Sequence, residues 1–228
     1  VYNNNKYWLG AWNTTGPTLI AKTNYLKSVL SQYGYSNKYL IASEIGLVCG
    51  VVESVPDTKH CDAQYSSSYA FQNTKAIYVA EAYAAGRYLN LKSNIWYSWW
   101  GWAYSGLYSG SVSRYEPAYY AYDYASGALN GATSAVELGI APDVKGYEFR
   151  WADKKVWVLW YVGGDPANGK LTVQVNMPST PLSVYRWVNY GTGAVNQGTY
   201  QPAAVSASLA IGREPVFITM TPCPAPAL

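Results

Sequence analysis

The chain has 228 residues, of which 50% are hydrophobic and only 13% are charged, a balance typical of a folded globular protein. Its net charge is only +3, and no run of lysine or arginine marks a face for nucleic acid. No apolar stretch approaches the roughly 20 residues that span a bilayer, so nucleic-acid binding and membrane spanning are both excluded from the expected functions.

Aromatic residues dominate the composition, with 24 Tyr and 10 Trp against 3 Phe. Their rings combine an apolar face with a polar group, which suits sugar binding and wet interfaces. A polar-leaning core in a secreted protein explains the same composition equally well. The low lysine content and the many Asn, Ser, Thr and Gly residues indicate an extracellular or cell-surface protein. The abrupt start at Val1, in an asparagine-rich run, is typical of a processed piece of a longer chain.

The first 90 residues predict a loop, a helix, a strand and a second helix. Residues 1–17 have no clean period and predict a loop. Apolar residues at helical spacing predict a helix over Thr18–Tyr33, which Gly34 ends. The run KYLIASEIGL, Lys38–Leu47, predicts a strand buried on both faces that ends at Glu44.

A long polar loop, Cys49–Ser68, follows this strand. Among the three cysteines of the chain, Cys49 and Cys61 are the pair that we expect to form a disulfide, because their bond staples a single loop. His60, the one histidine, lies beside Cys61, but this set falls short of the ligand spacing of a zinc site. We therefore expect no metal and no cofactor.

Helix and strand signals continue to alternate up to Leu129. They predict a helix over Ser68–Leu89, a buried strand over Asn94–Trp100 (NIWYSWW), and a third helix over Pro117–Leu129. This alternation predicts parallel strands in an α/β arrangement.

After Gly131 the pattern changes to short β-rich runs separated by polar turns. These runs predict an antiparallel β-sandwich, and the proline-rich end of the chain predicts a tail. The predicted domains are residues 1–131, residues 132–221 and the tail, 222–228. The predicted β-strands are Tyr147–Trp151, Lys155–Val162, Lys170–Met177, Ser183–Asn189, Val205–Ile211 and Pro215–Thr219.

KYLIASEIGL, then a helix, NIWYSWWGW, another helix and a β-rich region together resemble the C-terminal part of a clan A glycoside hydrolase. The resemblance implies the last two strands of a (β/α)8 barrel with their helices, followed by a β-sandwich. It also implies that Glu44 is the nucleophile of a retaining enzyme that cleaves a polysaccharide or oligosaccharide, and that Trp99, with Trp96 or Trp100, floors the site where the bond is cut.

The aromatic residues near the start of the chain supply a candidate rim for this substrate site. They are Tyr2, Tyr7, Trp8 and Trp12.

The chain lacks one of the two carboxyl groups that the expected reaction needs. Retaining glycosidases use two carboxyl groups, and the acid/base group of this clan follows its fourth strand, for which the chain has no matching segment. Two barrel strands alone also leave an open sheet edge and bare apolar faces. We therefore expect a partner: the N-terminal barrel half, from the same precursor or from a companion chain.

Two functions remain open from the sequence. In the first, the chain carries the nucleophile half of a glycosidase site. In the second, it is a non-catalytic, hydrolase-like scaffold that binds carbohydrate or builds an extracellular structure, and Glu44 only makes a salt bridge or caps the next helix.

Overall fold

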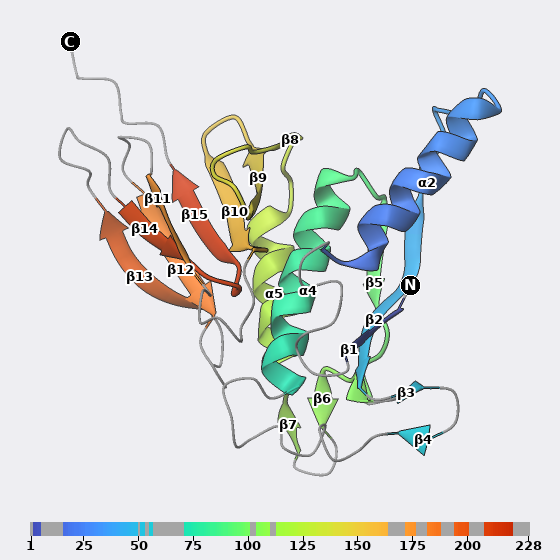
Figure 1. Ribbon diagram of the computed structural model, residues 1–228, viewed down its shortest axis with the longest axis horizontal. Helices are drawn as coiled ribbons and strands as arrows, with labels where there is room; N and C mark the ends of the chain where they lie inside the picture. Colours follow the sequence, from blue (N-terminus) through green and yellow to red (C-terminus); the bar gives the residue numbers. More distant parts are fainter. Residues whose placement is uncertain are drawn as a thin grey trace. The chain divides into compact units, whose positions relative to one another are not determined.

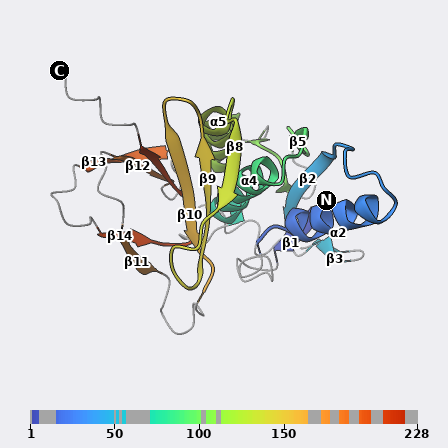
Figure 2. The same cartoon turned by 90° about the horizontal axis from the view of Figure 1, so that it is seen from above.

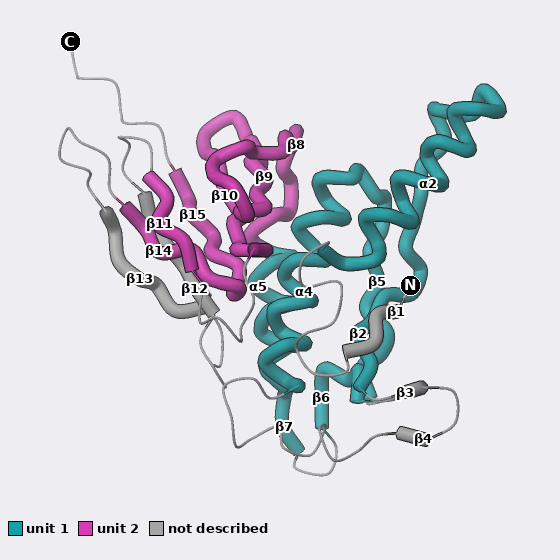
Figure 3. The backbone as a smooth tube through the Cα atoms, in the orientation of Figure 1, with its two compact units in different colours: residues 1–127, 189–193 teal, residues 128–188, 194–228 magenta. Residues whose placement is uncertain are grey.

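The chain divides into two compact units, residues 1–127 with 189–193, and residues 128–188 with 194–228 (Figure 3). This computed structural model describes residues 2–5, 16–49, 51–52, 55–56, 71–100, 104–109, 113–163, 172–176, 182–187, 194–200 and 208–220. In these ranges no helix is both long and apolar enough to cross a bilayer.

Unit 1 contains a three-stranded parallel sheet in the order β1-β2-β5. Its strands are β1 (Tyr2–Asn5), β2 (Ile41–Cys49) and β5 (Ser93–Trp96) (Figure 1). Parallel pairing of β2 with β5 confirms the α/β arrangement. The prediction of a loop over residues 2–5 was wrong, because the asparagines of β1 pair through their backbone with Gly46–Cys49 of β2, and a polar strand carries no apolar signal.

Three helices accompany this sheet: α2 (Thr18–Gln32), α4 (Phe71–Tyr88) and α5 (Pro117–Leu129). Helix α2 ends just before Gly34, whose φ of +78° favours glycine. Helix α5 begins with Pro117, whose ring fits the first helical turn. All three helices lie where the sequence predicts them, and the predicted start of α4 at Ser68 falls outside the described residues.

Helix α4 packs against one face of the sheet (Figure 1). Asn94 of β5 donates its Nδ2–H to the carbonyl oxygen of Ala82, 3.0 Å away. This approach requires the glycine at position 86, because a Cβ there would lie 2.6 Å from the Asn94 amide nitrogen. The sheet face that carries Asn94 is thus the face that α4 covers.

Short hairpins extend from the ends of β2 and β5. The pair β3 (Val51–Val52) and β4 (Val55–Pro56) follows β2, and the pair β6 (Tyr108–Ser109) and β7 (Arg114–Tyr115) follows β5. Both pairs lie at the end of the sheet where β2 and β5 finish, as Figure 1 shows. Loops at the carboxyl ends of parallel strands are where α/β folds place their functional side chains.

Unit 2 is built from antiparallel strands, as predicted. One sheet has six strands in the order β13-β12-β15-β10-β9-β8, and β11 pairs with β14 in a second sheet. The sequence missed two of these strands, β8 and β13. The bounds are β8 (Ser134–Glu137), β9 (Val144–Arg150), β10 (Lys155–Tyr161), β11 (Val173–Asn176), β12 (Leu182–Trp187), β13 (Ala194–Tyr200), β14 (Ser208–Ile211) and β15 (Val216–Met220).

The two sheets of unit 2 share one hydrophobic cluster. Val175 and Ile211 come from the β11–β14 pair, and Leu159 and Ile218 come from the six-stranded sheet. Figure 2 shows β11 and β14 in a layer apart from β12 and β13. Burial of these aliphatic side chains holds the two layers of unit 2 together.

Candidate functional site

Glu44 lies within β2 and not at its end, which corrects the prediction from sequence. The strand continues to Cys49 because β1 pairs with its last four residues. On the other side, the pairing of β2 with β5 stops at Ile45 and Trp96. Glu44 therefore lies next to the carboxyl end of the β2–β5 ladder, although five residues of β2 follow it.

A β-bulge turns Glu44 to the sheet face opposite α4. Between the pairs Ala42–Asn94 and Ile45–Trp96, β2 has one residue more than β5. Ala42 and Ile45 are buried, whereas Ser43 and Glu44, the residues between them, are exposed. The bulge thus aims a carboxylate away from the helix-covered face.

The face that carries Glu44, which we call the open face, is only partly polar. Ile41 of β2 is 55% exposed, and Ile95 of β5 is 51% exposed. The prediction that β2 is buried on both faces is thus wrong for Ile41–Glu44. Residues Ile45–Cys49 are buried, which agrees with the predicted buried run as far as Leu47, whereas Cys49 was predicted to begin a loop.

Tyr97 is a site residue that the sequence reasoning missed. Its backbone N–H donates to the carbonyl oxygen of Ile45, 2.8 Å away, so it continues the ladder beside Glu44. Its side chain is 40% exposed, in contrast to the buried Trp96. The alternation of side chains along β5 is the signal that could have found it, because Ile95 and Tyr97 face opposite to Trp96. The Tyr97–Ser98 peptide bond is cis.

Trp96 belongs to the core in this structure. Its ring meets Tyr78 of α4 edge-on at a centroid distance of 6.1 Å, and its Nε1–H donates to the carbonyl oxygen of Ser105 at 2.8 Å. The structure therefore separates Trp96 from Trp99 and Trp100, which are 45% and 62% exposed.

Trp99 and Trp100 join a group of tyrosines from the β6–β7 hairpin and the start of α5. Trp99 lies nearly parallel to Tyr108, with centroids 6.1 Å apart and 6° between the planes. Trp100 meets the same Tyr108 ring edge-on at 5.3 Å. Tyr115 stacks on Tyr119 at 4.2 Å. We call Trp99, Trp100, Tyr108, Tyr115, Tyr119 and Tyr120 the aromatic platform.

A buried lysine holds the loop between β5 and β6. The Nζ atom of Lys75, on α4, donates to the carbonyl oxygens of Tyr104, at 2.9 Å, and Gly106. Burial lowers the pKa of Lys75 to about 7, against a smaller opposing effect from the Glu116 carboxylate. Sequence patterns do not indicate this role, because a helical lysine is ordinarily exposed.

The remaining predicted site residues are described only in part. Tyr2 lies in β1, level with Gly46 of β2, and only its backbone is described. Trp8 lies outside the described residues. Cys49 is disulfide-bonded, but its partner lies outside the described residues, so the bond to Cys61 stays a prediction. In the described ranges, no group of three His, Cys, Asp or Glu residues could hold a metal ion.

No protein-family model and no curated protein sequence matches this chain. Solved structures of glycoside hydrolases do share its fold. An arabinofuranosidase matches with a TM-score of 0.59 at 10% identity, over 96% of this chain and 51% of its own. A β-porphyranase of glycoside hydrolase family 86 from Bacteroides plebeius matches with a TM-score of 0.54 at 14% identity, over 99% of this chain and 41% of its own.

A xyloglucanase of glycoside hydrolase family 44 from Paenibacillus polymyxa matches with a TM-score of 0.53 at 8% identity, over 88% of this chain and 35% of its own. The chain thus spans from about a third to about half of the length of these structures. Identities this low show a shared fold and no more, and the fold is that of glycoside hydrolases from several families.

Proposed function

We propose that this chain carries the nucleophile of a retaining glycoside hydrolase that acts on a β-linked glycan, with Glu44 as the nucleophile. The observation that carries the proposal is the position of Glu44. It is an exposed carboxylate at the carboxyl end of the β2–β5 ladder, on the open face, beside the exposed ring of Tyr97. The likeness in fold to glycoside hydrolases supports this assignment.

Each residue type suits the chemistry of the reaction. The Glu44 carboxylate attacks the anomeric carbon and forms a glycosyl-enzyme ester, which water then hydrolyses. A second carboxyl group, about 5–5.5 Å from the first in retaining enzymes, protonates the leaving oxygen and then activates the water. The aromatic face of Tyr97 packs against the apolar face of the sugar ring, and Trp99 and Trp100 lie farther along the same loop.

The second carboxyl group belongs, in this proposal, to a companion segment that completes the barrel. The described acidic residues of unit 1 other than Glu44 support this. Glu81 and Glu116 are buried, and Asp123 lies in the middle of α5. The exposed Ile41 and Ile95 on the open face give the companion an apolar surface to cover. Unit 2 is then a β-sandwich appended to the barrel, and the complete protein is secreted.

Substitution of Glu44 tests this function directly. In the complete protein, with its companion segment, Glu44→Gln should lower the turnover of aryl β-glycosides by several orders of magnitude. Ser43→Ala, at the neighbouring exposed position of the same bulge, is the matched control and should retain activity. If Glu44→Gln hydrolyses these substrates at the unsubstituted rate, or if the complete protein hydrolyses none of them, the chain is a scaffold and not part of an enzyme.

A further inference from the structure

The aromatic platform is built largely on loops whose described residues are held by hydrogen bonds. Its tryptophans follow β5, and its tyrosines come from the β6–β7 hairpin and from the first turn of α5. Leu107 and Tyr108 lie beside the residues that follow β5. The backbone N–H groups of Leu107 and Tyr108 donate to the carbonyl oxygen of Trp99, at 3.2 and 3.1 Å. These bonds hold the backbone of Tyr108 beside that of Trp99, and their two rings lie nearly parallel.

Further hydrogen bonds hold the same loop. Lys75 holds the carbonyl groups of Tyr104 and Gly106, and the side-chain hydroxyl of Ser105 donates to the carbonyl oxygen of Tyr97. The backbone N–H of Glu116 donates to the carbonyl oxygen of Leu107 at 2.8 Å, which joins the loop to the start of α5. A surface held in this way loses little conformational freedom when a ligand binds.

Three rings of the platform are exposed to solvent, although the six rings pack against one another. Trp100 is 62% exposed, Trp99 is 45% exposed and Tyr115 is 43% exposed. All six members are tyrosine or tryptophan, whose rings offer flat apolar faces and whose polar atoms can bond to hydroxyl groups. A sugar ring has the complementary surface, with apolar C–H faces and a rim of hydroxyl groups.

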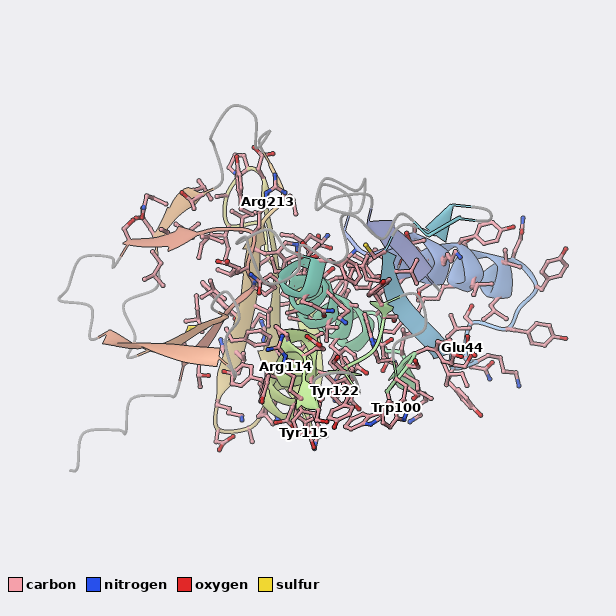
Figure 4. The ribbon with its side chains drawn as sticks, turned by 90° about the horizontal axis from the view of Figure 1, so that it is seen from below. Glu44, Trp100, Arg114, Tyr115, Tyr122 and Arg213 are labelled. Atoms are coloured by element: carbon pink, nitrogen blue, oxygen red, sulfur yellow. The ribbon has the colours of Figure 1, made fainter. Side chains whose placement is uncertain are left out.

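Trp99 and Trp100 follow Tyr97 by two and three residues, so the platform begins at the strand end next to the proposed nucleophile. Figure 4 shows Trp100 between Glu44 and Tyr115 in the view from below, the end of unit 1 where β2 and β5 finish. A glycan with one sugar unit at Glu44 can thus place its following units on Trp100 and then on the tyrosines. A single sugar ring covers only about one aromatic side chain, so the platform has room for several units.

We propose that the aromatic platform binds successive sugar units of a polysaccharide chain whose cleaved bond lies at Glu44, so that the substrate is a polymer cut at internal bonds. The cleavage part rests on the proposed function of Glu44, whereas the binding part does not. The rings of Trp100 and Tyr115 carry the binding.

Calorimetric titration of the complete protein carrying Glu44→Gln tests the proposal without turnover. The probes are the β-1,4-linked hexasaccharides of xylose and of glucose, each with its disaccharide. We expect at least one hexasaccharide to bind more tightly than its disaccharide. Adding Trp100→Ala or Tyr115→Ala should weaken hexasaccharide binding roughly tenfold, the scale of one lost stacking contact. Tyr115→Ala, which removes a ring beyond the second sugar unit, should leave disaccharide binding unchanged.

Two controls separate binding from folding. Tyr115→Phe keeps the ring and should keep most of the affinity. Tyr25→Ala removes a tyrosine that is 68% exposed on α2, away from the platform, and should change nothing. The same melting temperature in all variants shows that the fold is intact.

Three results overturn the proposal: no binding of either hexasaccharide, equal losses for disaccharide and hexasaccharide in Tyr115→Ala, or unchanged affinity in Trp100→Ala and Tyr115→Ala. If these variants instead lose a protein partner in pull-down, the platform is a protein interface. Platform-dependent hexasaccharide binding without any hydrolysis by the unsubstituted protein keeps the binding surface and rejects the proposed enzyme.

Discussion

Ile45 and Trp96 face each other across β2 and β5 as the last paired residues of that ladder, and both side chains are buried. Their burial fixes which way the flanking side chains point. Tyr97, one step beyond Trp96, turns to the open face, and the bulge turns Glu44 to the same face. A carboxylate and an aromatic ring thus share the open face at one end of the sheet.

This arrangement predicts that Tyr97 contributes to substrate binding and not to the stability of the fold. Tyr97→Ala removes a 40% exposed ring, so the melting temperature should change little. The value of kcat/KM for aryl β-glycosides should fall by roughly 10–100-fold, the cost of about 1.4–2.7 kcal/mol of lost transition-state binding. Steady-state kinetics measure this, and unchanged kcat/KM rejects the role of Tyr97.

Trp96, in contrast to Tyr97, should contribute to the stability of the fold and not to substrate binding. Trp96→Phe keeps an aromatic ring in the core but removes the 2.8 Å hydrogen bond to the Ser105 carbonyl. The free energy of unfolding should fall by about 1–3 kcal/mol, since a buried acceptor loses its donor. Denaturant unfolding measures the loss. A large fall in kcat/KM without a loss of stability would instead place Trp96 in the substrate site.

Lys75 predicts a pH-dependent stability. Burial lowers its pKa from 10.5 to about 7 in the folded chain, so between these values the unfolded chain binds more protons. The free energy of unfolding should therefore rise as the pH increases from 7 to 9. Lys75→Met removes this titration. Urea unfolding of both proteins across this range tests it, and an equal slope in the two proteins contradicts the buried, shifted lysine.

The open face predicts an interaction with the companion segment. Ile41→Asp and Ile95→Asp place a charge on side chains that are 55% and 51% exposed in this chain, so they should disturb little of the packing within the chain itself. Association with the companion should weaken by at least tenfold, because a buried unpaired carboxylate is costly. Val136→Asp, at a 36% exposed position in β8 of unit 2, is the control.

Measurements of mass, oligomeric state and folding can contradict the need for a companion segment. A species of 25.1 kDa that is the sole component in a denaturing gel, is monomeric and folds cooperatively would show that the chain needs no other barrel half. In that case the exposed isoleucines are ordinary surface residues.

Sequence patterns predicted the helices well because their signals are local. Apolar spacing, Gly34 and Pro117 mark where α2 ends and where α5 begins. The asparagine-rich β1 and the polar β13 carry no such signal, because their pairing is made by the backbone. Such strands can be found only through their neighbours.

Sequence reasoning placed Glu44 on a strand but misplaced it along that strand. Glu44 was identified from its strand, but the bulge that turns it and the continuation of β2 to Cys49 depend on pairing with β5 and β1. In the run NIWYSWW nearly every residue is apolar or aromatic, so the sequence could not show that Trp96 is buried and Tyr97 exposed. The role of Lys75 was missed because the carbonyl groups that accept its hydrogen bonds lie 29 and 31 residues farther along the chain.

Covalent trapping of the glycosyl-enzyme tests whether Glu44 is the nucleophile. The complete protein is incubated with 2-deoxy-2-fluoro-β-xyloside and -β-glucoside inactivators that carry a good leaving group, and the labelled peptide is sequenced by mass spectrometry. We expect inactivation with one fluorosugar attached to Glu44 through an ester. Inactivation with the label on any other carboxylate, or full activity without a label while the protein hydrolyses the corresponding aryl glycosides, would contradict it.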